Sequence, residues 1–165
     1  MAEIRPAEFP ADHAAVLAIF TEYVRSPSVS LDFQGYEDEF AELPGKYAPP
    51  EGRLLLATEG ERVLGCVALR KVNQRICEMK RLYVRPEGRG MALGRRLAEA
   101  VVEEARNAGY AEMRLDVLPE FEAARGIYRA MGFAPAPAVS HNPVPGTAFL
   151  GLDLRAGRNE SAHRG

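Results

Sequence analysis

The sequence predicts a single α/β (α+β) domain built on one mixed sheet with helices on both faces. Three strand-like stretches follow one another with only short turns between them, which indicates an antiparallel meander. A long amphipathic helix then leads to another strand, and a helical crossover of this kind makes the flanking strands parallel. The chain of 165 residues has the length of one domain, and its 47% apolar and 27% charged residues are ordinary for a globular protein. We therefore expect an antiparallel meander joined to a parallel pair.

The meander is predicted in the middle of the chain. Arg53 to Thr58 and Val63 to Leu69 are short apolar runs, and the connection between them contains a glycine, as in a hairpin. A polar turn at Asn73-Gln74 leads into a third strand from Ile76 to Val84. Because these connections are too short for a crossover, consecutive strands are expected to run in opposite directions.

The second half of the chain alternates helix and strand. From Leu93 apolar residues recur at helical spacing, and Gly109 follows at the position where helices favour a left-handed residue. The next strand is Met113 to Leu118, a second amphipathic helix starts at Pro119-Glu120, and the last strand is Thr147 to Leu154. The inner stripe of the second helix comprises Phe121, Ala124, Tyr128 and Met131.

The N-terminal part is predicted to add one short strand and two helices. Glu3 to Pro6 is an extended piece that a proline ends. Pro10-Ala-Asp12 starts a helix with Asp12 near its cap, and Ser26-Pro27 stops it. A short second helix is indicated by the spacing of Tyr36, Phe40 and Leu43.

The loop from Arg85 to Gly94 has the features of an anion-binding site. It places glycines and an alanine where the chain turns into the long helix, so that backbone N–H groups can approach a ligand closely. A helix N-terminus also carries partial positive charge, which favours a phosphate or pyrophosphate. Basic residues crowd the same region, namely Lys80, Arg81, Arg85, Arg89, Arg95 and Arg96.

Two common phosphate-binding motifs do not fit this loop. A P-loop requires Lys followed by Ser or Thr after its second glycine, and no such pair follows Gly88 or Gly90. A dinucleotide fingerprint has two residues between its second and third glycines, whereas Met91, Ala92 and Leu93 separate Gly90 from Gly94.

The loop instead resembles a motif of a known family. Arg89-Gly90-Met91-Ala92-Leu93-Gly94, set between a strand and an amphipathic helix, is similar to the acyl-CoA-binding motif Q/R-x-x-G-x-G/A of the GCN5-related N-acetyltransferase (GNAT) superfamily. Ala92 stands at the first glycine of that pattern and keeps the backbone N–H that phosphate binding uses.

A second stretch resembles the family signature N-x-x-A-x-x-L-Y-x-x-x-G-F. The matching residues are Ala124, Tyr128, Gly132 and Phe133. Ile127 replaces the leucine, and Phe121 occupies the asparagine position, which removes one hydrogen bond that the family makes to the pantetheine arm. The resemblance covers Glu3 to Leu154, because the predicted order of elements is also that of the family.

The resemblance implies a function. We expect an N-acetyltransferase domain at residues 2–155, followed by a disordered tail at 156–165. The enzyme would transfer an acetyl group from acetyl-CoA to the primary amine of a small, cationic acceptor by direct attack. A non-catalytic acyl-CoA-binding domain and a protein N-acetyltransferase are the alternatives, and a homodimer would be ordinary for the family.

The co-substrate site is expected where the parallel strands separate. A pantetheine arm can add to the exposed strand edge there, so we expect it on backbone groups of Leu82, Tyr83 and Val84. The pyrophosphate is expected on the amide groups of the loop and of the first helical turn, which belong to Arg89, Gly90, Met91, Ala92, Leu93, Gly94 and Arg95.

Two residues are candidates for proton transfer. Tyr128 is the expected general acid, because the family carries a tyrosine at this position whose hydroxyl reaches the leaving sulfur. Glu78 interrupts an apolar central strand near the co-substrate site, which suits a general base. The alternative for Glu78 is an ion pair with Lys80 or Arg81.

The acceptor site is left open by the sequence. Asp32, Glu37, Asp38, Glu39 and Glu42 form either a solvated helix face or a negative wall that attracts a cationic amine. His141 and Asn142 lie in the proline-rich loop before the last strand, where family members shape the acceptor pocket. His13 is expected to be a solvated surface residue.

Composition argues against several other classes of protein. Cys66 and Cys77 lie in predicted strands without CxxC or histidine-rich neighbours, so we expect buried reduced thiols and no metal site. The N-terminus lacks the apolar run of a signal peptide, and we expect a cytoplasmic protein with no membrane contact. The local cluster of basic residues lies near the phosphate loop, so nucleic-acid binding is not expected.

Overall fold

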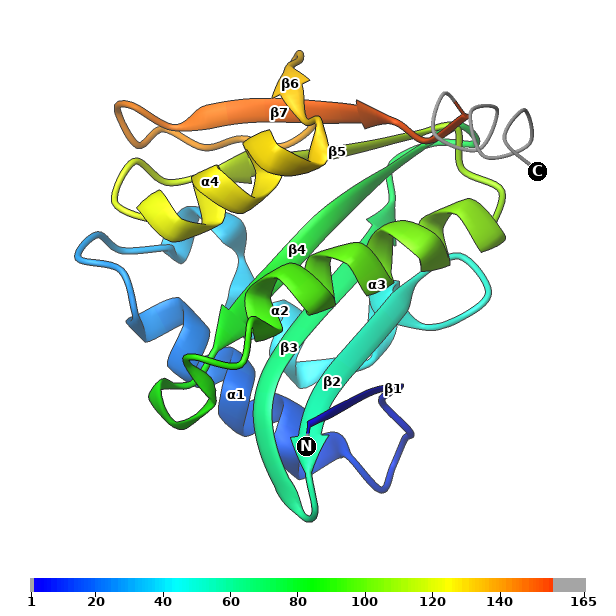
Figure 1. Cartoon of the computed structure of the whole chain (residues 1–165), viewed down its shortest axis with the longest axis vertical. Coiled ribbons are helices and arrows are strands. Elements are labelled where there is room, and N and C mark those ends of the chain that lie inside the picture. The colour runs from blue at the N-terminus through cyan, green and yellow to red at the C-terminus, as the bar shows by residue number, and fades with distance from the viewer. Residues whose placement is uncertain (1, 156–165) are drawn as a thin grey trace.

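The computed structural model describes residues 2–155, and its centre is a seven-stranded mixed sheet of order β1-β2-β3-β4-β5-β7-β6 (Figure 1). The strands are β1 (Glu3–Pro6), β2 (Arg53–Glu59), β3 (Arg62–Lys71), β4 (Ile76–Val84), β5 (Glu112–Val117), β6 (Ala134–Pro135) and β7 (Ala148–Asp153). The α-helices are α1 (His13–Arg25), α2 (Tyr36–Ala41), α3 (Leu93–Asn107) and α4 (Glu122–Met131). Three short 3₁₀ turns complete the order, η1 (Asp32–Gln34), η2 (Gly45–Tyr47) and η3 (Pro86–Gly88).

Strands β1 to β4 form an antiparallel sheet, which confirms the predicted meander. The hairpin between β2 and β3 turns through Gly60-Glu61, and Gly60 has a φ of +62°, a conformation that glycine adopts without strain. Strand β4 has the bounds that the sequence predicts. The parallel neighbour of β4 is β5, also as predicted.

The parallel pair holds together at one end only. β4 and β5 are paired at Ile76–Glu112, Cys77–Met113 and Glu78–Arg114, and the pairing stops there (Figure 1). From Met79 onward, the edge of β4 that faces β5 has no strand partner in the described chain. The two strands diverge beyond this point, and backbone groups that a closed sheet would use internally are left for another partner.

A β-bulge bends β4 in the part of the strand that is not paired with β5. Cys66 of β3 lies opposite Tyr83 and Ala68 lies opposite Lys80, so β4 contains one extra residue between these two pairs. Arg81 lies in this bulge with a φ of +63°, which is uncommon for a residue other than glycine. Arg81 bonds from this bulge to Glu39 of α2 and to Gln34 of η1.

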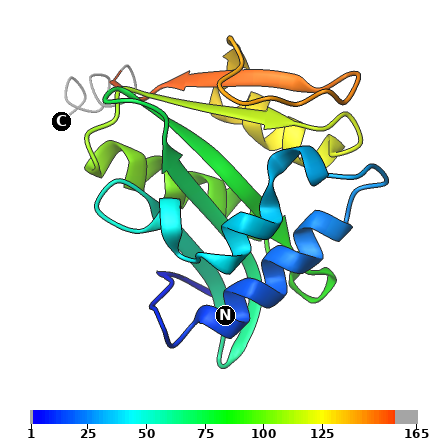
Figure 2. The same ribbon diagram turned by 180° about the vertical axis from the view of Figure 1, so that it is seen from behind.

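Helices cover both faces of the sheet, and each face has its own core (Figures 1 and 2). On one face α3 and α4 pack on the sheet through residues such as Leu97, Val101 and Tyr128. On the other face α1 packs against β2 and β3, with Phe20 and Leu56 fully buried. The two faces therefore supply different side chains to the gap between β4 and β5.

The structure differs from the sequence prediction at several element ends. Helix α4 begins at Glu122 because Leu118 to Phe121 form a turn closed by the Phe121 N–H and the Leu118 carbonyl, 3.1 Å apart. The short strand β6 was not predicted and pairs with β7. The predicted disordered tail at 156–165 lies outside the described residues.

Asp12 precedes α1 as predicted but does not bond to the helix through its side chain. Its carboxylate accepts hydrogen bonds from Arg5 and from the Glu8 N–H, each 2.7 Å long. The bond from Arg5 is the largest cause that lowers the Asp12 pKa to about 2.

Both cysteines are buried free thiols, as expected. Cys66 lies opposite Tyr83 and Cys77 lies opposite Lys71, so the strand register does not pair them with each other. Among residues 2–155, no helix combines the length and the apolar character that crossing a bilayer requires.

The core under α3 should carry much of the stability. We expect Leu97→Ala to lower the free energy of unfolding by about 2–5 kcal/mol, because Leu97 is fully buried and its truncation leaves a cavity. Urea denaturation followed by circular dichroism measures this change. The matched control is Leu17→Ala, since Leu17 on α1 is 37% exposed and its truncation should cost about 0.5 kcal/mol or less. Equal losses in the two variants would contradict this account.

Candidate active site

Two cavities meet where β4 and β5 separate. The larger has a volume of about 440 Å³ and lies between the end of β4, the start of α3, and α4. The smaller, of about 40 Å³, lies between β4, β5 and the loop before β7. Four residues line both cavities, namely Tyr23, Leu82, Phe121 and Ala124. The cavities are therefore neighbouring parts of one site that opens through the gap in the sheet.

The larger cavity is lined by half of the residues predicted to bind the co-substrate. These are Leu82, Tyr83, Val84, Arg89 and Gly94. Gly94 allows a close approach here, since a Cβ on it would lie 3.2 Å from the Ile127 Cδ1 atom of α4. The strand edge, the helix start and the neighbouring helix thus form one continuous wall.

The start of α3 presents a group of free amide donors. The N–H groups of residues 90–95 have no acceptor within residues 2–155, and the first intrahelical bond runs from the Arg96 N–H to the Ala92 carbonyl at 3.1 Å. Ala92 and Gly90 have φ values of 56° and 89°, and left-handed residues of this kind let successive backbone N–H groups form a concave anion site. This geometry and the partial charge of the helix end suit an anion.

The predicted cluster of basic residues is mostly paired within the protein. Arg81 pairs with Glu39, Arg85 with Glu22 and Arg95 with Glu99. Arg96 donates to the Ala2 carbonyl. Arg89 lines the larger cavity, and its guanidinium has no hydrogen bond or ion pair within the described chain. Arg89 is therefore the arginine of the loop that is available to a ligand.

The remaining predicted residues of this loop do not line the cavity with their side chains. Leu93 is buried in the core, and Met91 is 38% exposed. Gly90, Ala92 and Arg95 lie outside the lining of the larger cavity. Any role of these residues in binding would depend on their amide groups.

Tyr128 projects from α4 into the smaller cavity. Its ring packs on Phe133 with the centroids 5.5 Å apart, and the residue is 5% exposed. Its hydroxyl has no hydrogen-bond partner within residues 2–155. Burial is the largest cause that raises the Tyr128 pKa far above its usual range, so the hydroxyl keeps its proton and acts as a donor.

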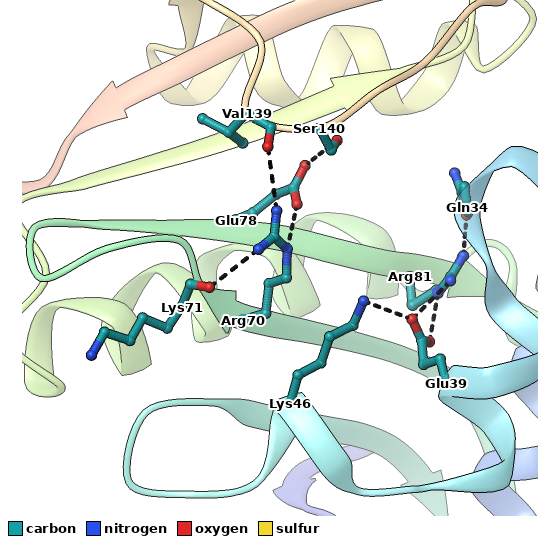
Figure 3. A network of polar contacts seen from close by, with 9 residues as sticks. All are labelled: Gln34, Glu39, Lys46, Arg70, Lys71, Glu78, Arg81, Val139 and Ser140. Carbon is teal, nitrogen blue, oxygen red and sulfur yellow. Dashed lines mark hydrogen bonds and ion pairs between the residues drawn. The ribbon is translucent and has the colours of Figure 1, made fainter.

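Glu78 lies in an ion pair and not in either cavity (Figure 3). Its carboxylate accepts from Arg70 Nε and from Ser140 Oγ, both at 2.8 Å, and its side chain is 1% exposed. The alternative prediction for Glu78, an ion pair with Lys80 or Arg81, is therefore wrong about the partner, which is Arg70. Arg70 lies directly opposite on β3, and two side chains facing each other across antiparallel strands point to the same side.

Arg81 forms the second polar network of Figure 3. Its guanidinium donates to both oxygens of Glu39 at 3.0 Å and to the Gln34 side chain, and Lys46 also pairs with Glu39. The rings of Tyr23 and Phe40 lie 5.4 and 5.8 Å from the guanidinium carbon. This network holds the segment around α2 against the bulge of β4.

The acidic stretch does not form a wall of the smaller cavity. Glu39 is neutralised by Arg81 and Lys46, and Asp32, Glu37 and Asp38 line a separate surface depression. The carboxylate on the smaller cavity is Asp116 of β5, which accepts from Asn142 Nδ2 at 2.9 Å.

Asn142 lines the smaller cavity as the loop prediction suggested, whereas His141 packs edge-on against Phe33 at 6.3 Å. Sequence reasoning missed Tyr23 and Asp116 as lining residues. Tyr23 shows no motif, and burial raises its pKa to about 12. Asp116 lies between the buried Leu115 and Val117 on β5. This alternation places Asp116 on the opposite face of the sheet from them, but it does not predict that the residue lines a cavity.

Comparisons with known proteins identify the family of this chain. Residues 16–133 match the acetyltransferase (GNAT) family, and the chain belongs to that family. An uncharacterized N-acetyltransferase from Schizosaccharomyces pombe is 36% identical over 153 residues, which cover 92% of this chain and 94% of the relative. The protein is thus an enzyme of the acyltransferase class.

Solved structures show the same fold. The PaiA N-acetyltransferase from Thermoplasma acidophilum, solved in complex with coenzyme A, aligns with a TM-score of 0.70 at 16% identity, covering 93% of this chain and 99% of its own. The yncA protein from Salmonella typhimurium, solved with acetyl-CoA, aligns with a TM-score of 0.66 at 24% identity, covering 93% and 94%.

The left-handed Ala92 should cost stability. We expect Ala92→Gly to raise the free energy of unfolding by up to about 1 kcal/mol, because glycine adopts this conformation without the contact between Cβ and carbonyl. Chemical denaturation measures the change. The matched control is Ala100→Gly in the middle of α3, which should lower stability by about 1 kcal/mol. A loss of stability in Ala92→Gly would show that the helix start does not have this conformation.

Proposed function

We propose that the protein transfers an acetyl group from acetyl-CoA to the primary amine of a small acceptor by direct attack. The observation that carries this proposal is the continuity of the larger cavity, lined by the open edge of β4 and the start of α3, with the smaller cavity lined by Tyr128. The neighbouring structures solved with coenzyme A or acetyl-CoA support the choice of co-substrate.

The residues around the larger cavity suit the chemistry of coenzyme A. We place the pyrophosphate on the free amide groups of residues 90–95, with Arg89 adding a positive charge. Backbone groups of Leu82 to Val84 would bind the amides of the pantetheine arm like an added strand. Phe121 stands at the family's asparagine position and would contact the arm by packing, since it lines both cavities.

The smaller cavity supplies the groups for proton transfer. The amine nitrogen attacks the thioester carbon, a C–N bond forms and the C–S bond breaks. We propose that Asp116, the carboxylate of this cavity, takes the proton that the ammonium loses, directly or through water. After the C–N bond forms, the nitrogen loses its second proton to water, and Asp116 releases the first proton to solvent. The Tyr128 hydroxyl donates a proton to the leaving thiolate and regains one from water. The products are the N-acetyl amide and coenzyme A.

Calorimetry with coenzyme A tests the co-substrate. The purified protein should bind coenzyme A, and release of free thiol from acetyl-CoA should require an amine. Absence of binding would overturn the proposal. Binding without turnover on any amine or peptide would favour the non-catalytic alternative.

Tyr128→Phe should lower kcat by roughly 10²-fold, because a general acid typically contributes at least this factor. Its affinity for coenzyme A should stay within about twofold, since the hydroxyl makes no hydrogen bond within residues 2–155 on which the fold would depend. Steady-state kinetics and calorimetry measure the two quantities. The control is Phe133→Leu, which changes the ring beside Tyr128 and keeps the hydroxyl. Unchanged turnover in Tyr128→Phe would remove Tyr128 from the mechanism.

The substitutions Glu78→Gln and Asp116→Asn distinguish the roles of the two carboxylates. We expect Glu78→Gln to lower the free energy of unfolding by about 1–3 kcal/mol through the weakened bond to Arg70, and to change kcat by less than about threefold. Asp116→Asn should lower kcat by roughly 10²-fold, because the amide cannot accept the proton of the acceptor ammonium. The reverse pattern would assign the general base to Glu78.

A further inference from the structure

One cation that lines the smaller cavity has no partner within the described part of the chain. Arg81 and Gln34 bond to each other, and Arg81 also bonds to Glu39. Asn142 donates to Asp116 and accepts from the Val144 N–H at 3.1 Å. Lys80 lines the cavity and has no hydrogen bond or ion pair within residues 2–155.

The position of Lys80 makes this lack of a partner informative. Lys80 lies on the central strand β4, opposite Ala68 of β3. Its side chain is only partly exposed. Burial is the largest cause that lowers its pKa. A partly buried ammonium without a partner is unfavourable, and an anion that enters the cavity would offset this cost.

The charged groups around Lys80 determine which ligand groups the smaller cavity can bind. Glu78 and Arg81 of β4, Asp116 of β5 and Lys46 of η2 act on it electrostatically. Glu78 is held by Arg70 and Ser140, Arg81 by Glu39, and Lys46 by Glu39 as well. Asp116 accepts from Asn142 through Oδ2, and its Oδ1 atom has no hydrogen bond within residues 2–155. The cavity thus offers one positive and one negative group to a ligand.

We propose that the acceptor is zwitterionic, a small amino acid or a related amino-carboxylic acid, whose carboxylate binds Lys80 while its amine faces Asp116. The inference deepens the proposed function and rests on it. The volume of about 40 Å³ has room for a few water-sized groups, which suits a small charged head of this kind. A plain cationic amine would leave Lys80 unpaired and would bring a second positive charge beside it.

Turnover of matched acceptors tests the inference. Free L-α-amino acids, short ω-amino acids, their carboxamides and the corresponding amines without the acid are each supplied with acetyl-CoA, and free thiol is measured. The acid form of the best acceptor should exceed its carboxamide in kcat/KM by about 10- to 100-fold, the effect of one hydrogen-bonded charge. The difference should lie mainly in KM.

Variants of Lys80 connect this preference to the side chain. Lys80→Gln should reduce the ratio between acid and carboxamide to within about threefold of one. Lys80→Arg, which keeps the charge, should retain most of the preference. The matched control is Lys71→Gln, since Lys71 pairs with Glu51 on the surface and lies outside the cavity. Binding of coenzyme A by each variant shows that it is folded.

The outcomes separate this inference from the proposed function. Turnover of amines and carboxamides as good as that of the acids would overturn the zwitterionic acceptor and leave the acetyltransferase in place. The same would follow from an acid preference that persists in Lys80→Gln. If no member of the panel releases thiol although coenzyme A binds, both the small-molecule function and the inference fail.

Discussion

The site depends on the early end of the pairing between β4 and β5. Two parallel strands that share three residue pairs and then separate leave an unpaired backbone edge, and such an edge in a protein interior needs a partner. The separation also opens a passage between the two faces of the sheet. Side chains of α4 and side chains of the α1 face can therefore line the same cavity, although the sheet would otherwise keep them apart.

The bulge at Arg81 determines what lies in that gap. By adding one residue to β4, it places Lys80 and Arg81 toward the same face, and Arg81 then bonds to the segment around α2. This bond keeps that segment beside the gap. The left-handed conformation of Arg81 has a cost of its own, which the bidentate bond to Glu39 offsets.

Pairing within the protein decides which charges are available to ligands. Arginines that stand close together in the sequence point to different elements and find separate partners, as Arg81 does with Glu39 and Arg85 with Glu22. Arg89 at the larger cavity and Lys80 at the smaller one are left without such a partner in the described chain. A count of basic residues in a loop therefore overstates the positive charge that a ligand meets.

Local patterns of the sequence determined the sheet, the crossover and the start of α3, because strand alternation, helical periodicity and glycine placement depend on neighbours in the chain. The bounds of β4, the parallel pair and the place of Tyr128 on α4 followed from these patterns. Only the tertiary structure decided that Glu78 pairs with Arg70, that Asp116 bonds to Asn142 and that Lys80 has no partner among residues 2–155. Each of these results depends on the register between strands and on the packing of a distant loop. Local sequence patterns do not reveal either one, because both bring together residues that are far apart in the chain.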